Sequence, residues 1–177
     1  MTKRKLATVW LDGCSGCHMS LLDMDERLLE LSEEFDLVYS PLVDYKIFPE
    51  GVDVALVEGA VSSDEDENRI RMIRKRTKML VALGDCAVTG NVPSLRNTIP
   101  VDAILKRVYE ENVTGPRATP ADGLPKLLAR VRPVHEVVPV DVFVPGCPPS
   151  ADMIYKILVE TLAGKVPDLA GATHFGA

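Results

Sequence analysis

The chain alternates short apolar runs with longer stretches in which apolar residues recur every three or four positions. The short runs have the length of strands and are almost continuously apolar, which is typical of strands buried on both faces. The longer stretches have the period of amphipathic helices. This alternation predicts an α/β fold, in which a parallel sheet is covered by helices on both faces. The predicted strands are 6–10, 35–39, 52–57, 79–83 and 140–144.

The helix predicted over 64–76 has the clearest boundaries. Ser62 and Ser63 precede it as hydroxyl caps, acidic residues fill its first turn and basic residues its last. The helix dipole selects this order of charges, so we interpret the charged runs as a solvated helix rather than a binding patch. Ser150 is expected to cap a final helix that ends at Gly164. The other predicted helices are 21–35 and, in a proline-rich segment, those near 101–112 and 124–130.

Length and composition indicate one folded domain. The chain has 177 residues, of which 46% are hydrophobic and 26% charged, so a single core suffices. We expect one domain over 1–177, with a loop-rich excursion at about 91–139 that contains seven of the 13 prolines.

Charge and hydropathy limit the classes of partner and the cellular locations that we expect for this chain. The net charge of −6 and one local basic cluster argue against nucleic acid as a partner. No apolar run has the length of a spanning helix and the N-terminus has no signal-peptide pattern, so we expect no membrane insertion and a cytoplasmic location.

The four cysteines supply the candidate chemistry. Cys14, Cys17, Cys86 and Cys147 each lie in a Gly- or Pro-rich turn just after a predicted strand. Because the carboxyl ends of parallel strands share one edge of the sheet, these turns should converge there. A 4Fe–4S cluster needs four thiolates around it, and a Cys-x-x-Cys turn can supply two of them. The sequence therefore favours one such cluster, held by these four residues.

Other interpretations of these thiols remain open. Four thiolates also satisfy tetrahedral zinc, although structural zinc sites usually combine two local Cys-x-x-Cys pairs. A redox dithiol at Cys14 and Cys17 would leave Cys86 and Cys147 unexplained. Disulfides are rare in a reducing compartment, and buried thiols without a function would not explain four similar turns.

Three residues beside the cysteine turns are candidates for supporting roles. His18 follows Cys17 and could replace a thiolate ligand or, as we favour, serve as a hydrogen-bonding or interface residue. Glu58 ends the third strand, where it could relay protons or, as we favour, accept hydrogen bonds from loop amides. Trp10 could exclude water from a cluster or pack in the core.

These turns resemble a known family. The stretches 10–17, 57–59, 84–87 and 145–149 look like the proximal-cluster motifs of nickel–iron hydrogenase small subunits, and the resemblance spans nearly the whole chain. The related 20 kDa subunit of respiratory NADH:quinone oxidoreductase shares the Pro-Gly-Cys-Pro turn but has two adjacent cysteines where this chain has Cys14-Ser-Gly-Cys17. That spacing favours the hydrogenase branch, in particular the short subunit of cytoplasmic, NAD-linked enzymes.

The resemblance implies a flavodoxin-like fold and an electron-transfer role. One 4Fe–4S cluster would relay electrons between the Ni–Fe site of a large subunit and diaphorase subunits that carry iron–sulfur clusters and FMN, with NAD or NADP as acceptor. The Ni–Fe site would lie on the partner, since that centre uses two Cys-x-x-Cys pairs. FMN is not expected here, because cysteines replace the phosphate loop of flavodoxins. The alternatives are an electron-wire subunit of a quinone reductase or other dehydrogenase, and a zinc-stabilised binding module.

Overall fold

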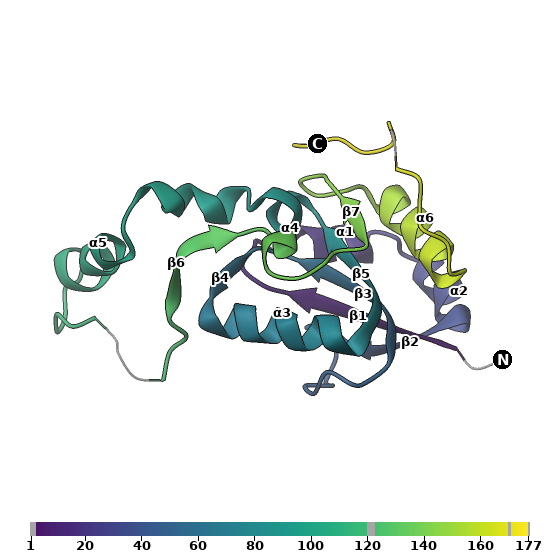
Figure 1. The fold of residues 1–177 in the computed structure, drawn as a ribbon, viewed down its shortest axis with the longest axis horizontal. Helices are drawn as coiled ribbons and strands as arrows, with labels where there is room; N and C mark the ends of the chain where they lie inside the picture. The colour runs from purple at the N-terminus through teal and green to yellow at the C-terminus, as the bar shows by residue number, and fades with distance from the viewer. Residues whose placement is uncertain (1–2, 120–122, 170, 177) are drawn as a thin grey trace.

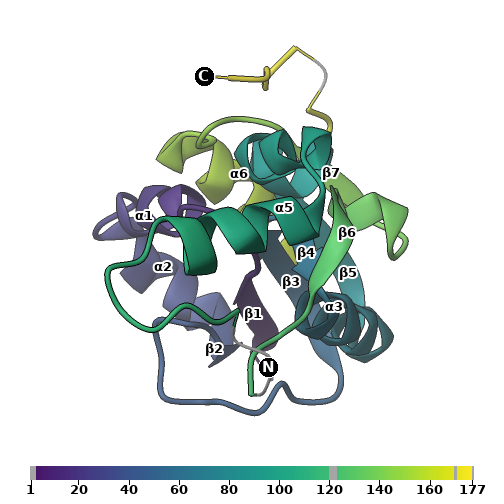
Figure 2. The same ribbon diagram turned by 90° about the vertical axis from the view of Figure 1, so that its left-hand side faces the viewer.

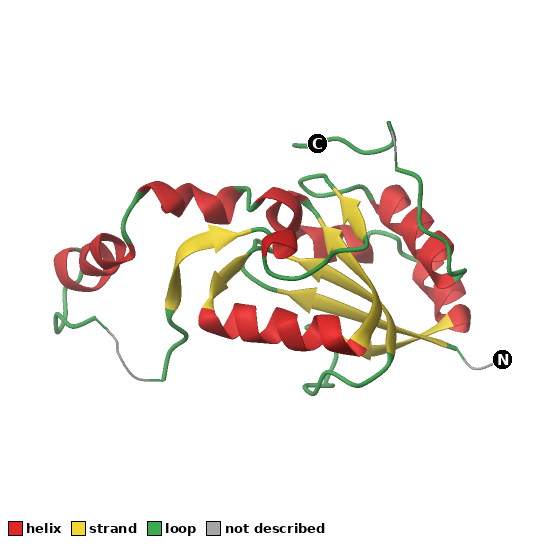
Figure 3. Cartoon of the chain, in the orientation of Figure 1, coloured by secondary structure: helices red, strands yellow, loops and turns green. Residues whose placement is uncertain are grey.

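A five-stranded parallel sheet forms the centre of the molecule. The computed structural model describes residues 3–119, 123–169 and 171–176. All pairings within this sheet are parallel, and helices cover both of its faces (Figure 1 and Figure 3). The predicted fold class is thereby confirmed. The strand order is β2 (Phe35–Tyr39), β1 (Arg4–Trp10), β3 (Val52–Glu58), β5 (Thr77–Leu83) and β7 (Val142–Val144).

Alternation along the strands sends side chains into two separate cores. On one face, Ala55, Val57 and Leu80 pack with Ile70 and Ile73 of α3 (Asp64–Arg76). On the other face, Leu56 and Val81 pack against three helices, α1 (Gly16–Leu22), α2 (Arg27–Glu34) and α6 (Ala151–Leu162). Both faces are therefore dry, which explains the nearly continuous apolar strands in the sequence.

The predicted helix over 21–35 is wrong in its continuity. The structure has two helices there, α1 (Gly16–Leu22) and α2 (Arg27–Glu34). Between them Asp25 has a left-handed backbone with φ of 50°, which a helix interior cannot contain. Asp tolerates this conformation better than most residues, and the apolar period continues across the break because both helices face the same core.

The other two long helices confirm their predicted caps. The Ser63 hydroxyl accepts a hydrogen bond from the Asp66 amide at 3.1 Å, and the Asp66 carboxylate accepts one from the Ser63 amide, which is a capping box at the start of α3. Ser150 caps α6 (Ala151–Leu162), and Gly164 follows that helix with a φ of 76°. With 13 residues in α3, no helix of the described chain is long and apolar enough to cross a bilayer.

Part of the segment between β5 and β7 extends away from the sheet in Figure 1 and lies in front of the sheet in the turned view of Figure 2. The helix predicted near 101–112 is present as α5 (Val101–Lys106), continued by one π-helical stretch, η2 (Arg107–Glu111). Short turns of helix flank the cysteine edge. They are α4 (Asp85–Thr89), η1 (Val92–Thr98) and η3 (Val134–Glu136).

The helix predicted near 124–130 is wrong, because Leu127–Arg132 forms strand β6. This strand pairs antiparallel with β4 (Val61–Ser63) in a separate two-stranded sheet. Asn97 binds both the amide and the carbonyl of Val131, at 2.7 and 2.9 Å. These tertiary hydrogen bonds outweigh the helix preference of a Leu-, Ala- and Arg-rich stretch.

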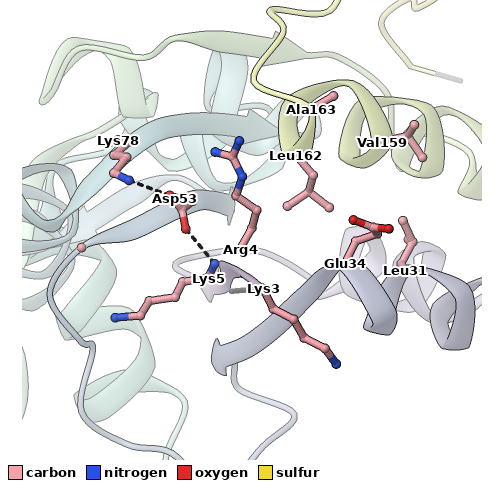
Figure 4. Close-up of a pocket in the computed structure, with 11 residues that line it drawn as sticks. Lys3, Arg4, Lys5, Leu31, Glu34, Asp53, Lys78, Val159, Leu162 and Ala163 are labelled. Atoms are coloured by element: carbon pink, nitrogen blue, oxygen red, sulfur yellow. Dashed lines mark hydrogen bonds and ion pairs between the residues drawn. The ribbon is translucent and has the colours of Figure 1, made fainter. Parts of the chain in front are cut away.

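A groove of about 1010 Å³ lies at the amino edge of the sheet, away from the cysteine turns (Figure 4). Two of the cations that line it, Lys3 and Lys78, have structural partners. Lys3 donates to the Ser32 carbonyl near the end of α2 at 2.6 Å, as cations do at helix C-termini. Lys78 binds the Asp53 carboxylate at 2.8 Å, and the Lys5 amide donates to the same carboxylate at 2.8 Å.

Asp53 should make stability depend on pH. Burial would raise the pKa of Asp53, but the hydrogen bonds from Lys78 and the Lys5 amide outweigh it and lower the pKa below 3.8. Its contribution is therefore present above the unfolded pKa and is lost as the pH falls through the folded value. Asp53→Asn should cost about 1 kcal/mol at neutral pH, a modest loss because water screens the exposed Lys78.

Thermal unfolding of wild type, Asp53→Asn and the exposed-site control Asp36→Asn, followed by circular dichroism, checks this prediction. The difference between wild type and Asp53→Asn should shrink at about pH 3. A difference that stays constant with pH would contradict it.

Candidate iron–sulfur site

One row of residues across the sheet marks where the cysteine loops begin. Trp10 pairs with Glu58, Glu58 with Leu83, and Leu83 with Val144. Cys14 and Cys17 follow β1, Cys86 follows β5 and Cys147 follows β7. Because the strands are parallel and end in register, all four thiols lie in segments that leave the same edge, as the sequence predicts. Cys14 and Cys147 are in loops, whereas Cys17 is in the first turn of α1 and Cys86 is in α4.

The thiols lie close enough to influence one another electrostatically. Burial is the main cause that raises the pKa of Cys17 above its ordinary value, followed by Glu58 and the other three cysteines. Burial, Cys14 and Cys147 raise the pKa of Cys86 to about 11. The loops thus concentrate four sulfurs whose combined negative charge is unfavourable unless a cation compensates it. A metal bound by these thiols would displace their protons.

Gly84 gives Cys17 the room it occupies. A Cβ atom on Gly84 would lie 2.3 Å from the Cys17 sulfur, far inside van der Waals contact. Gly84 also has a φ of 83°, which favours glycine. Gly84, two residues before Cys86, therefore makes room for a cysteine of a different segment, which sequence spacing alone does not reveal.

Glu58 anchors the first cysteine loop. It is 2% exposed, and its carboxylate accepts hydrogen bonds from the amides of Cys17 at 3.4 Å and His18 at 2.9 Å. The structure thus places Glu58 in the amide-accepting position that we favoured over proton relay. A buried carboxylate needs such partners, since its desolvation is otherwise costly.

The His18 ring faces Glu58 and Thr8 in the core. Its Nδ1 contacts Glu58 Oε2, and its Nε2 lies 3.0 Å from Thr8 Oγ1. The Thr8 hydroxyl donates to Ser40 Oγ at 2.8 Å. All four side chains are buried. With both ring nitrogens engaged, His18 extends the support of the loop into the sheet.

Trp10 and Asn91 border the site from the outside. Trp10 is 44% exposed and donates from Nε1 to the Gly13 carbonyl at 3.1 Å, so it braces the loop and does not belong to the core. Asn91 Nδ2 donates to the Cys147 sulfur at 3.6 Å. Hydrogen bonds to ligand sulfurs tune reduction potentials in iron–sulfur sites.

Sequence reasoning missed several supporting residues. Thr8 and Ser40 are ordinary strand-end hydroxyls in the sequence, and only the fold pairs them with His18. Asp85 offered a signal, because an acid between apolar strand residues and a cysteine needs a partner once it is buried. Its carboxylate accepts a hydrogen bond from the Gly146 amide, in the loop of Cys147.

The donor set fits an iron–sulfur cluster. All four cysteines are free, and the three segments that follow β1, β5 and β7 bring four potential sulfur ligands to one edge. No three His, Cys, Asp or Glu side chains in the described residues are grouped closely enough to hold a single metal ion, so the fit to a cluster rests on the type of the donors and on their convergence at one edge.

Comparison with known proteins shows the family. The family model described as NADH ubiquinone oxidoreductase, 20 Kd subunit, matches residues 14–161. The chain belongs to this family. The match begins at Cys14 and includes all four cysteines of the site. Membership in this oxidoreductase subunit family confirms the relationship expected from the cysteine turns.

Within the 20 Kd subunit family, several relatives are hydrogenase subunits. The chain is 41% identical over 177 residues to the NAD-reducing hydrogenase HoxS subunit delta of Cupriavidus necator, covering 97% of this chain and 85% of the relative. It is 39% identical over 167 residues to a subunit of the F420-non-reducing hydrogenase vhu of Methanocaldococcus jannaschii, covering 93% of this chain but 58% of that protein.

The fold of this family member also matches a solved hydrogenase structure. A chain in the crystal structure of an NAD+-reducing [NiFe]-hydrogenase in the H2-reduced state superposes with a TM-score of 0.94 and 40% sequence identity. The alignment covers 99% of this chain and 100% of the other. The excursion and the cysteine loops therefore have counterparts in that chain, whose whole length is aligned.

Gly84→Ala should disrupt the site directly. The added methyl group must displace the Cys17 sulfur and forces alanine into a left-handed backbone, at a cost of about 1–2 kcal/mol for the backbone alone. We expect metal bound per chain to fall well below that of wild type. Elemental analysis of the purified protein measures this loss.

Gly115→Ala is the matched control, since nothing lies within 4 Å of a Cβ at Gly115 and its φ carries no left-handed strain. Equal metal content in both alanine variants would contradict the role assigned to Gly84.

Proposed function

We propose that this chain is the electron-transfer small subunit of an NAD(P)-reducing [NiFe] hydrogenase. In this proposal Cys14, Cys17, Cys86 and Cys147 hold one 4Fe–4S cluster, which relays electrons from the Ni–Fe site of a large subunit toward a diaphorase module. The observation that carries it is the convergence of four free thiols at one sheet edge, in a chain that aligns end to end with a chain of an NAD+-reducing [NiFe]-hydrogenase.

The bound cluster would supply one-electron redox chemistry, and the residues of this chain would control its surroundings. Glu58 orients the Cys14–Cys17 loop through two amides, and Gly84 leaves space for the Cys17 sulfur. Asn91 donates a hydrogen bond to the Cys147 sulfur. Together these contacts constrain the positions of the sulfurs, and the Asn91 side-chain amide balances part of the negative charge on the Cys147 sulfur.

The exposed residues at the cysteine edge favour a permanent interface with a partner subunit. Cys14 and Cys147 are exposed, and Trp10, Met19 and Leu95 are exposed apolar side chains at 44%, 56% and 71%. An exposed cluster would react with water and oxidants, so we propose that the large subunit covers this edge. The diaphorase subunits, with their clusters and FMN, would complete the electron path. Free thiols fit the reducing cytoplasm, where we place the complex.

Two alternatives give different experimental results. The family model itself describes a subunit of a quinone reductase, so an electron-wire role in such a complex is the second candidate. The hydrogenase relatives and the Cys14-Ser-Gly-Cys17 spacing favour the first. A zinc-stabilised binding module is the third, and metal identity separates it from both.

Anaerobic purification of the chain with its partners tests the proposal. We expect about four irons and four sulfides per chain, no stoichiometric zinc, and an electron paramagnetic resonance signal that appears under hydrogen. A cluster reduced by dithionite but not by hydrogen would favour the second candidate. Zinc without iron would refute both electron-transfer roles.

Cys14→Ser and Cys147→Ser should abolish electron transfer from hydrogen to NAD(P) in the complex. A hydroxyl replaces a soft thiolate ligand in each variant, so the cluster is lost or altered. The assay is hydrogen-dependent reduction of NAD(P), together with nickel content of the large subunit, which should persist.

Ser15→Ala is the control for these substitutions. Ser15 lies in the same loop as Cys14, and its hydroxyl donates a hydrogen bond to the Cys14 backbone carbonyl. Unchanged coupled activity in either serine variant would refute the relay.

A further inference from the structure

Asp85 links three separate segments beside the cysteine edge. It directly precedes Cys86 and is 5% exposed. Its Oδ1 accepts from the Gly146 amide at 2.7 Å, and its Oδ2 accepts from the Gly176 amide at 2.8 Å. Both oxygens thus bind backbone amides, which balance the buried negative charge with oriented dipoles.

The bonds around Asp85 set the distance between two cysteine loops. The Gly84 amide donates to the Val144 carbonyl at 2.8 Å and the Asp85 amide to the Gly146 carbonyl at 2.9 Å. With the Gly146 amide on Oδ1, Asp85 and Gly146 exchange two hydrogen bonds. Since Cys86 and Cys147 are the next residues in each loop, this pair fixes where both sulfurs can lie.

The same carboxylate attaches residues 171–176 to the Cys147 loop. This segment passes over the loop that follows β7, as Figures 1 and 2 show. The two enclose a cavity of about 190 Å³, which is lined from the loop side by Pro145, Pro148 and Pro149 and from the segment side by Ala172, Thr173 and His174. Gly176 supplies the amide that binds Asp85.

We propose that Asp85 is a positioning residue that fixes the separation of Cys86 and Cys147 and holds residues 171–176 as a cover over the Cys147 loop. Its buried charge lies beside the ligands and disfavours an added electron, so Asp85 also lowers the reduction potential of the bound cluster. The effect on the potential rests on the proposed function, whereas the attachment of residues 171–176 does not.

Two substitutions separate these roles. Asp85→Asn keeps an oxygen for the Gly146 amide but replaces the second acceptor with an NH2 group, which cannot accept from Gly176. Asp85→Ala removes both acceptors and leaves the buried Gly146 amide unpaired. Asp152→Asn is the control, because it removes one negative charge from the first turn of α6 at a carboxylate that is 86% exposed.

The measurements are made on the anaerobically purified complex. Hydrogen–deuterium exchange reports residues 171–176, redox titration with electron paramagnetic resonance gives the midpoint potential, and elemental analysis gives iron per chain. In Asp85→Asn we expect amide exchange in residues 171–176 to be at least about tenfold faster than in wild type, because a charge-assisted hydrogen bond is lost. We also expect an unchanged iron content and a more positive midpoint potential. In Asp85→Ala we expect loss of iron as well.

The outcomes distinguish this inference from the function on which part of it rests. Wild-type exchange and potential in Asp85→Asn, or shifts equal to those of Asp152→Asn, would overturn the role of Asp85 while leaving the relay intact. A wild-type complex without iron would refute the proposed function and with it the effect on the potential. Exchange in 171–176 would then still decide whether Asp85 holds that segment.

Discussion

A carboxylate buried at the end of the central strand is the constraint on which the site depends. Glu58 ends β3, between β1 and β5, and accepts the amides of Cys17 and His18 while contacting the His18 ring. Without these partners a carboxylate that is 2% exposed would be strongly destabilising. The loop therefore has one favourable arrangement. The end of β1 determines where the Cys14–Cys17 loop begins, and Glu58 determines how that loop is oriented.

Asp85, the buried acid beside Cys86, likewise has backbone amides as the partners of its carboxylate. Burial and neighbouring thiols raise the pKa of both Cys17 and Cys86. The fold thus brings together groups that repel one another once ionised. In the proposed function, a cationic cluster among the sulfurs would compensate these charges and would couple the completion of the site to the bound group.

The sheet was predictable because its strands are buried on both faces and read as continuous apolar runs. The capped helices were predictable because Ser63 and Ser150 mark their starts. The helix predicted near 124–130 failed because side chains distant in sequence, notably Asn97, determine the conformation of β6. The cysteine edge followed from strand order, but Thr8, Ser40 and Asp85 acquire partners only in three dimensions, so their roles required the structure.

The two cores of the sheet meet at the cysteine edge. Cys17 packs in one core with α1 and α6, while Ala87, the neighbour of Cys86, packs in the other with α3. A packing fault on either face would therefore displace at least one of the four sulfurs, so the geometry of the cysteine edge depends on both cores at once.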